Sequence, residues 1–449
     1  MGWSIRNVSC ANGTFLLALL LLVITSPLFL QHCLARRESQ HRPQPGGRHH
    51  PPPPVPAMPP PPPPPPPASS ATFSVLDYGA AFADAWSAAC AVAASTVLVP
   101  ASSVFLVGPI TFTGDSCEPN MAFQVDGSIL AHTGSTAWRA GVVTQWLDFK
   151  NVQGLTIRGC GTVNGQGSHW WSGGSVAGNA DVMELDYDRV GTSNRPTAVR
   201  VFRGANVTVT GITIRNSAKF HLTFDTCRAV EVHDVAVSSP GESPNTDGIH
   251  LAGSVGVSIH HSTVACGDDC ISIQDGCSDV FIRSVHCGPG HGISIGGLGK
   301  GGASAVVSDV TVQDVTLNQT TTGVRIKTWQ GGSGSVKNVR FSGVRVSAVK
   351  TPIVIDQYYC DHTACTNHTS AVAVAGVAYQ GVAGTYTERP VYLACSDAAP
   401  CSGIHLADIQ LAPVEDSGYH LHGPFCWKAY GDQVRPVEPP VDCLMAGDP

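Results

Sequence analysis

The sequence predicts a solenoid of short parallel β-strands, in which each turn of the chain stacks on the turn before it. Short β-branched segments recur along the chain, among them Val257-Ser258-Ile259, Val280-Phe281-Ile282 and Val310-Thr311-Val312. Gly, Asn and Asp, which favour turns, separate these segments. Polar clusters also recur at intervals of just over twenty residues, a period typical of repeat architectures. Equivalent residues on successive turns would therefore be neighbours, roughly 4.8 Å apart.

The N-terminus has the pattern of a secretory signal peptide. Arg6 precedes an apolar run from Phe15 to Leu30, and small residues around Ala35 provide a cleavage site. The alternative is a signal anchor, but the run contains Pro27 and is short for a membrane span. We therefore expect residues 1–35 to be removed, with no stable membrane insertion and a secreted, extracellular location.

Residues 36–72 have the composition of a linker. A basic, histidine-containing stretch is followed by nearly continuous proline from Pro51 to Pro67, which predicts an extended polyproline II spacer without a core. An alternative interpretation is an arm whose cations contact an acidic polymer.

Residues 73–449 are predicted to form one domain, because a solenoid grows by adding turns. Phe73 to Leu76 is the expected first strand. The Ala-rich segment from Ala81 to Ala94 is the expected short helix, which would cover the open N-terminal end of the coil. Further expected strands are Val97–Val99, Leu155–Ile157, Val207–Val209, Ile212–Ile214, Ile293–Ile295 and the runs within 336–349 and 353–360.

Cysteine content and charge narrow the class of protein. Of sixteen cysteines, Cys10 and Cys33 precede the cleavage site, and the even number that remains favours disulfides in a secreted chain. The absence of any Cys-x-x-Cys pair argues against a zinc site. Close pairs such as Cys360/Cys365 and Cys395/Cys401 are candidates for small disulfide loops. The net charge of −7 argues against nucleic acid as a partner.

Four polar clusters are expected to converge on one face of the coil. They are Asn245-Thr246-Asp247, Gly267-Asp268-Asp269-Cys270, Gly290-His291-Gly292 and Arg325-Ile326-Lys327. Stacking would gather three carboxylates, one imidazole and two cations there. Adjacent residues of a flat strand point to opposite faces, so Asp268 and Asp269 can act together only if Gly267 permits a bend. A lone Asp is more often a turn residue, but three at the repeat spacing favour a site.

These clusters resemble the signature of the plant polygalacturonases, pectin-cleaving glycoside hydrolases with a right-handed parallel β-helix. The matching segments are residues 243–250, 267–273, 288–296 and 324–329, with a further likeness at Gly161–Gly167 and Trp170-Trp171. The resemblance covers roughly Phe73 to the C-terminus and implies an all-β, single-stranded right-handed parallel β-helix with a short N-terminal capping helix. The chain departs from the family after Ala80, where an acidic loop is missing.

The resemblance also implies catalytic roles. Asp268 matches the general acid, Asp247 and Asp269 match the pair that activates water, and His291 matches a histidine that supports the acid. Water between acid and base implies a wide carboxylate gap and inversion at the anomeric carbon. Crowding of carboxylates would raise the pKa of one of them and keep a proton available. A Cys270–Cys287 disulfide would brace the site.

Substrate contacts follow from the same motifs. Arg325 and Lys327 flank an inward Ile326, so both are expected on the outer face, where they suit a galacturonate carboxylate; otherwise they are a solvated surface pair. Tyr359 matches a substrate-contacting tyrosine, although Tyr358 adjoins it. Asn245 is assigned to substrate binding as well. No metal and no cofactor is expected.

The function expected is that of a secreted polygalacturonase, a monomer that hydrolyses α-1,4-galacturonosyl linkages of de-esterified pectin (homogalacturonan) in cell-wall remodelling. One alternative is a pectate-lyase-like enzyme that uses calcium and a basic residue to abstract a proton. Another is a non-catalytic wall protein that only binds pectin. Glycosylation acceptor motifs begin at Asn206, Asn318 and Asn367.

Overall fold

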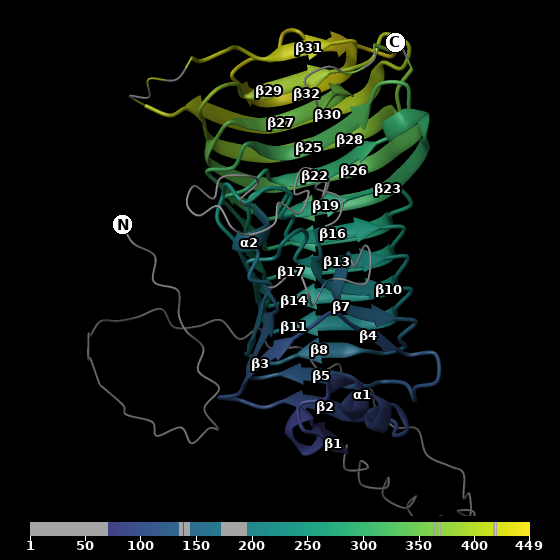
Figure 1. Cartoon of the computed structure of the whole chain (residues 1–449). Helices are drawn as coiled ribbons and strands as arrows, with labels where there is room; N and C mark the ends of the chain where they lie inside the picture. Colours follow the sequence, from purple (N-terminus) through teal and green to yellow (C-terminus); the bar gives the residue numbers. More distant parts are fainter. Residues whose placement is uncertain are drawn as a thin grey trace, which may run out of the picture. The chain divides into compact units, whose positions relative to one another are not determined.

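A computed structural model describes residues 71–133, 138, 144–171, 195–361, 365, 367–368, 370–415, 418 and 420–449. Over these residues the chain winds into a right-handed parallel β-helix, coloured from purple to yellow along the coil (Figure 1). All strand pairs are parallel, and each strand pairs with its equivalents on the turns before and after it. The fold class predicted from the sequence is confirmed.

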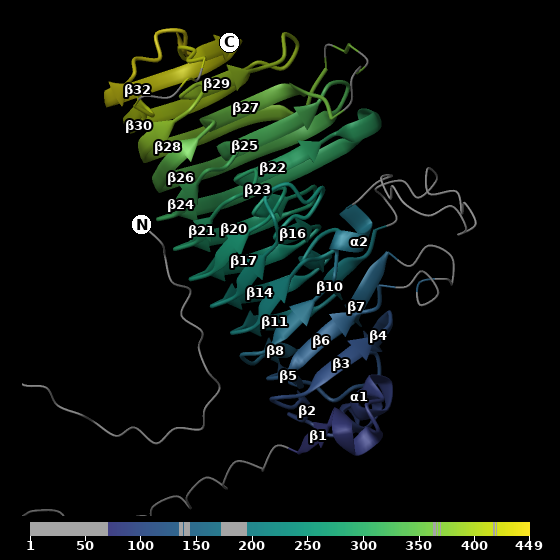
Figure 2. The ribbon, with the colours of Figure 1, turned by 60° about the vertical axis from the view of Figure 1, so that its left-hand side comes forward.

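The turns build three ladders of strands, which Figure 2 shows stacked along the coil. The first ladder contains β1 (Thr72–Ser74), β2 (Thr96–Val99), β5 (Ala122–Val125), β8 (Thr156–Arg158), β11 (Ala205–Thr210), β14 (Arg228–His233), β17 (Val255–His260), β20 (Ser278–Arg283), β23 (Ser304–Gln313), β26 (Ser333–Val349), β28 (Ala373–Tyr386), β30 (Cys401–Pro413), β32 (Ala429–Glu438) and β33 (Met445–Ala446). The second contains β3 (Val104–Val107), β6 (Ser128–Ala131), β9 (Thr162–Asn164), β12 (Thr213–Arg215), β15 (Ala236–Ser238), β18 (Thr263–Ala265), β21 (His286–Cys287) and β24 (Thr316–Asn318), and it joins the first at the long strand β26.

The third ladder is the one that carries the polar clusters. It contains β4 (Ile110–Thr113), β7 (Gln145–Lys150), β10 (Thr197–Phe202), β13 (Leu222–Asp225), β16 (Ile249–Ala252), β19 (Ile271–Ile273), β22 (Ile293–Leu298), β25 (Thr322–Trp329), β27 (Thr351–Tyr359), β29 (Val391–Ala394) and β31 (Phe425–Trp427).

The core of the coil consists of columns of like side chains. In the first ladder the strand pairing places Val207, Val230, Val257, Val280 and Val310 directly above one another, and all five are buried. β-Branched side chains pack well in this arrangement. Burial of each such side chain favours folding by about 1.5–3 kcal/mol. The repeated Val and Ile of the sequence are therefore the stacking units of the solenoid.

A tight corner precedes this column on each turn, and its residues have left-handed backbone conformations. Non-glycine residues with positive φ at this corner include Asn206, Asp279, Asp309 and Asn338, and Gly256, Gly376 and Gly403 occupy it on other turns. Asn, Asp and Gly adopt this conformation at the lowest cost. The Asn, Asp and Gly residues between the β-branched segments thus suit the corner, although Ala229 adopts the same conformation on the turn that contains β14.

The helix α1 (Phe82–Cys90) covers the N-terminal end of the coil, as expected, although it is shorter than 81–94. Its buried residues Phe82, Ala85, Trp86 and Ala89 recur at helical spacing. The Trp86 ring packs on Phe112 with centroids 5.1 Å apart. The first strand ends at Ser74, where a single 3₁₀ turn (Val75–Tyr78) replaces the strand expected to Leu76. Among the described residues the only other α-helix, α2 (Ser168–Trp171), is one turn long, and a second 3₁₀ turn covers Lys300–Gly302.

Three cysteine pairs named from the sequence are disulfides in the structure. They are Cys270–Cys287, Cys360–Cys365 and Cys395–Cys401, and Cys90–Cys117 and Cys426–Cys443 are also bonded. The expectation from the even count is not met throughout, since Cys227, Cys266 and Cys277 are buried free thiols. They fill core positions as small apolar residues do.

The predicted signal peptide and nearly all of the proline-rich linker lie outside the described residues. Within the described part of the chain, no helix is long and apolar enough to cross a membrane. The acceptor asparagines Asn206 and Asn318 are exposed, whereas the third motif includes a residue that is not described.

Candidate active site

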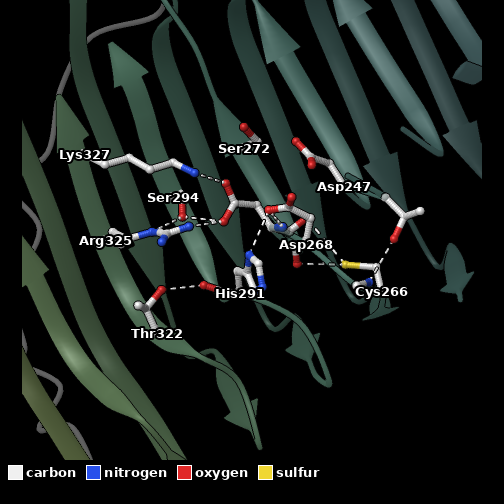
Figure 3. Close-up of polar contacts among 12 residues, drawn as sticks. Asp247, Cys266, Asp268, Ser272, His291, Ser294, Thr322, Arg325 and Lys327 are labelled. Atoms are coloured by element: carbon white, nitrogen blue, oxygen red, sulfur yellow. Dashed lines mark hydrogen bonds and ion pairs between the residues drawn. The ribbon is translucent and has the colours of Figure 1, made fainter. Parts of the chain in front are cut away.

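Four neighbouring turns of the third ladder bring the polar clusters together. The pairing of β16, β19, β22 and β25 places His250, Ser272, Ser294 and Arg325 in one outward row. Asp247, the Asp268-Asp269 pair and His291 lie just before these strands. Figure 3 shows the side chains converging: Arg325 and Lys327 reach in from β25, and Asp247 lies on the opposite side.

The bend that the two adjacent aspartates require is present at Gly267. Its amide donates a hydrogen bond to the Thr246 hydroxyl at 2.9 Å. A Cβ on Gly267 would collide with the backbone of Ser243, so no other residue fits there without displacing the previous turn. The Asp269 amide then donates to Asp268 Oδ1 at 2.8 Å. The bend thus turns both carboxylates toward the same face.

Asp269 is the most enclosed of the three carboxylates. The Arg325 guanidinium and the Ser294 hydroxyl donate to its Oδ1 at 2.6 and 2.7 Å, and Lys327 Nζ donates to its Oδ2 at 2.8 Å. Burial acts to raise the pKa of Asp269, but the two cations outweigh burial and hold the pKa at about 2. Asp269 is therefore an anion at any working pH and a weak proton acceptor.

Asp268 is the most accessible carboxylate, with 19 % of its side chain exposed. His291 Nδ1 donates to its Oδ1 at 3.0 Å, and Oδ2 has no hydrogen-bond partner among the described residues. The His291 carbonyl accepts a hydrogen bond from the Thr322 hydroxyl, which fixes the loop that carries the imidazole. Asp268 thus presents one open oxygen, and His291 orients the other.

Asp247 lies in a different electrostatic environment. Burial, together with the neighbouring Asp268 and Asp269 carboxylates, raises its pKa, and a 3.0 Å hydrogen bond from His250 Nδ1 only partly opposes the rise. The Lys219 ammonium is close enough to be affected by Asp247, although burial lowers the pKa of Lys219. Of the two buried carboxylates, Asp247 is the stronger base when ionised.

The separation of two of the carboxylates differs from the expectation. Ligating atoms of Asp268, Asp269 and His291 all lie within 4.8 Å of one another. Most inverting glycosidases leave about 6.5–9.5 Å between their two carboxyl groups to admit water. The wide gap expected from the sequence is therefore not found between Asp268 and Asp269.

The structure also places the expected substrate contacts. Arg325 and Lys327 share the outer face, with only 13 % and 8 % of their side chains exposed, which excludes the solvated surface pair. Lys327 Nζ lies 5.2 Å from the ring centre of Tyr359, whereas the Tyr358 hydroxyl points away and donates to Asp397 at 3.4 Å. Asn245 is exposed in the loop before Asp247.

The sequence interpretation missed several residues that hold the site. Ser294 bridges Asp269 and the Arg325 Nε, which is 3.0 Å from its hydroxyl, and His250 holds Asp247. His250 and Ser294 occupy equivalent positions of their repeats, each between two buried apolar residues. A polar residue flanked in this way is predicted to face outward, and this pattern could have identified both. Buried His221 is also part of the site: its Nδ1 donates to the Asp247 carbonyl at 2.9 Å, and burial lowers its pKa to about 4.

The site thus combines one open and two enclosed carboxylates on a single face of a β-helix, an arrangement suited to general acid and general base chemistry. A family model described as glycosyl hydrolases family 28 matches residues 90–419, and the chain belongs to this family. It is therefore a glycoside hydrolase. The chain is 39 % identical over 373 residues to a probable polygalacturonase of Arabidopsis thaliana, with 82 % of this chain and 81 % of that protein covered. It is also 39 % identical to a polygalacturonase of Chamaecyparis obtusa, with 76 % and 67 % covered.

Solved structures agree on the fold. A polygalacturonase from Erwinia carotovora superposes with a TM-score of 0.61 at 22 % identity, covering 79 % of this chain and 94 % of that one. An endopolygalacturonase from Stereum purpureum in complex with two galacturonates gives 0.59 at 18 % identity, covering 81 % and 99 %. Both support the parallel β-helix.

Proposed function

We propose that this protein is a secreted polygalacturonase that hydrolyses α-1,4-galacturonosyl linkages of de-esterified pectin in the cell wall, with inversion at the anomeric carbon. The observation that carries the proposal is the division of the three carboxylates into one open and two enclosed groups, beside two cations. A galacturonan is a polyanion, and the guanidinium of Arg325 and the ammonium of Lys327 in the site complement its charge.

Each carboxylate has a role suited to its surroundings. Asp268 protonates the glycosidic oxygen through its open Oδ2, oriented by the imidazole of His291. Asp247, whose pKa burial raises, takes a proton from the attacking water, which is accommodated on the Asp247 side of Asp268. Asp269 remains ionised beside Lys327 and positions that water by hydrogen bonding. The sequence analysis assigned activation of water to Asp247 and Asp269 jointly, whereas here Asp247 accepts the proton and Asp269 only positions the water.

Substrate binding uses the same cations. Arg325 and Lys327 offer their remaining N–H groups to the carboxylate of a galacturonate beside the cleaved bond, and Tyr359 covers Lys327 from the next turn. Asn245, on the exposed loop before Asp247, contacts the galacturonan on the side opposite Arg325 and Lys327. The substrate displaces no structural contact, because Asp269 keeps the cations in place.

The calcium-dependent lyase is disfavoured by the contacts of Asp269. Asp268, Asp269 and His291 have the spacing of a metal site, but Arg325 and Lys327 each bind one oxygen of Asp269, and their positive charges would repel a divalent cation. A lyase also needs a neutral base, whereas Asp269 raises the pKa of Arg325 even though burial acts against the cation. A non-catalytic binding protein would not need an acid and a base in such different environments.

The mature protein is expected to release reducing ends from polygalacturonate at an undiminished rate in the presence of a calcium chelator, without a product that absorbs in the ultraviolet. The hydrolytic roles of Asp268 and Asp247 require water and no metal. The test follows both signals in one digestion, with a commercial calcium-dependent pectate lyase as the control for chelation. If an unsaturated product forms and is lost when the chelator is added, the protein is a calcium-dependent lyase and the hydrolase proposal is wrong.

A further inference from the structure

Beyond the candidate active site, the outward face of the third ladder continues toward the C-terminus as an aromatic surface. The pairing of β25, β27, β29 and β31 aligns Arg325 with Val354, Tyr392 and then Phe425. The next outward row aligns Lys327 with Asp356, Ala394 and Trp427. We call Tyr392, Phe425 and Trp427 the aromatic platform. Figure 1 shows these strands stacked one after another up to the yellow end of the coil.

The platform is exposed and its rings are held in fixed positions. Phe425 and Trp427 are 38 % and 48 % exposed, and Phe425 stacks on Tyr392 with ring centres 5.2 Å apart and planes at 20°. Trp427 Nε1 donates to Asp397 Oδ1 at 3.2 Å, and Asp397 also accepts from Tyr358. Rings fixed in this way lose little conformational freedom when a ligand packs on them.

Two cations accompany the rings. The Arg389 guanidinium lies 5.8 Å from the centre of Tyr392 and 5.6 Å from that of Phe425, and Lys428 Nζ lies 5.9 Å from that of Trp427. Neither cation forms an ion pair with a carboxylate of the described residues. Their remaining donors are therefore available to an anion.

We infer that the aromatic platform is a distal binding surface for the same galacturonan chain whose scissile bond lies at Asp268. This inference rests on the proposed function. The apolar faces of successive sugar rings pack on Tyr392, Phe425 and Trp427, and Arg389 and Lys428 pair with their carboxylates. Three strand spacings separate Arg325 from Phe425, about 14 Å, so only a chain longer than the minimal substrate reaches the platform.

Simple protection of the end of the coil does not account for these rings. Such a role would direct them along the coil axis, over the last turn, whereas the strand register places them on the same outward face as Arg325 and Lys327. A second copy of the chain is the other possible occupant, and the experiment separates the two.

The test compares Trp427→Ala and Phe425→Ala with wild type on long polygalacturonate and on the shortest oligomer that the enzyme cleaves. The ratio of kcat/KM for the long substrate to that for the short one is expected to fall about three- to tenfold, through KM, as fits the loss of one aromatic contact. Val434→Ala is the control, since Val434 is 52 % exposed on β32 of another ladder and should leave the ratio unchanged. Arg389→Gln should lower the ratio mainly at low salt.

Binding distinguishes failure of the platform from failure of the proposed function. Calorimetry in the Asp268→Asn background should show that Trp427→Ala weakens binding of a long oligogalacturonate. A neutral dextran, which has no carboxylates, is the control ligand, and Trp427→Ala should not change its binding. If binding depends on Trp427 but the wild-type protein cleaves no galacturonan, the aromatic platform is a binding surface and the proposed polygalacturonase activity is wrong. An unchanged ratio and unchanged binding would overturn the platform, as would a dimer in sedimentation that Trp427→Ala dissociates.

Discussion

Asp268→Asn is expected to lower kcat on polygalacturonate by about 10²–10⁴-fold, the contribution of a positioned general acid. The amide keeps the shape and the hydrogen bond from His291, but it cannot protonate the leaving oxygen. An aryl galacturonide with a good leaving group needs no such proton and should retain much of its rate. Initial rates on both substrates measure the difference.

Two comparisons make this result specific. Asp247→Asn removes the base and should slow both substrates alike, because water is needed in either case. Asp279→Asn, at an exposed corner with φ of 54°, should leave both rates unchanged, because Asn adopts that conformation equally well. Equal losses on the two substrates for Asp268→Asn would mean that Asp268 is not the acid.

Asp269→Ala is expected to destabilise the fold by about 3–5 kcal/mol, because it leaves Arg325 and Lys327 enclosed without their counter-charge. Asp269→Asn should cost less, since its carbonyl still accepts from Ser294. Urea unfolding of both variants measures the loss. Asp432→Ala, an exposed ion-pair partner of His405, should stay within about 0.5 kcal/mol of wild type. A loss of unfolding free energy as small as this for Asp269→Ala would show that Arg325 and Lys327 do not need the Asp269 carboxylate as a counter-charge.

The same carboxylate predicts how this difference varies with pH. The pKa of Asp269 is lowered from 3.8 to about 2 in the folded protein by Lys327 and Arg325, against the effect of burial. A lowered pKa means that the ionised form stabilises the fold, fully above 3.8 and progressively less as the pH falls toward 2. The stability difference between wild type and Asp269→Asn should therefore shrink over that interval.

Much of the fold could be predicted because the repeat is local. The Val and Ile segments, the Asn, Asp and Gly corners and the Ala-rich cap each specify their part of one turn, and stacking of turns does the rest. The convergence of Asp247, Asp268 and His291 followed from their spacing alone.

Contacts that depend on register could not be predicted in the same way. The sequence indicated that Arg325 and Lys327 face outward, but not that both would bind Asp269, because this depends on side-chain conformations across three turns. The enclosure of Asp269 and the raised pKa of Asp247 follow from that packing. The alignment of Phe425 with Arg325 likewise required the pairing of β27, β29 and β31, which are separated along the chain by β28 and β30 of another ladder.

The configuration of the first product tests the proposed mechanism most directly. Proton NMR of a fresh digestion of an α-linked galacturonan reads the new reducing end before it mutarotates. Attack by a water activated at Asp247, opposite the acid Asp268, predicts that the β-anomer appears first. An initial α-anomer would contradict the account, because the short Asp268–Asp269 separation would then reflect a nucleophile and a covalent intermediate.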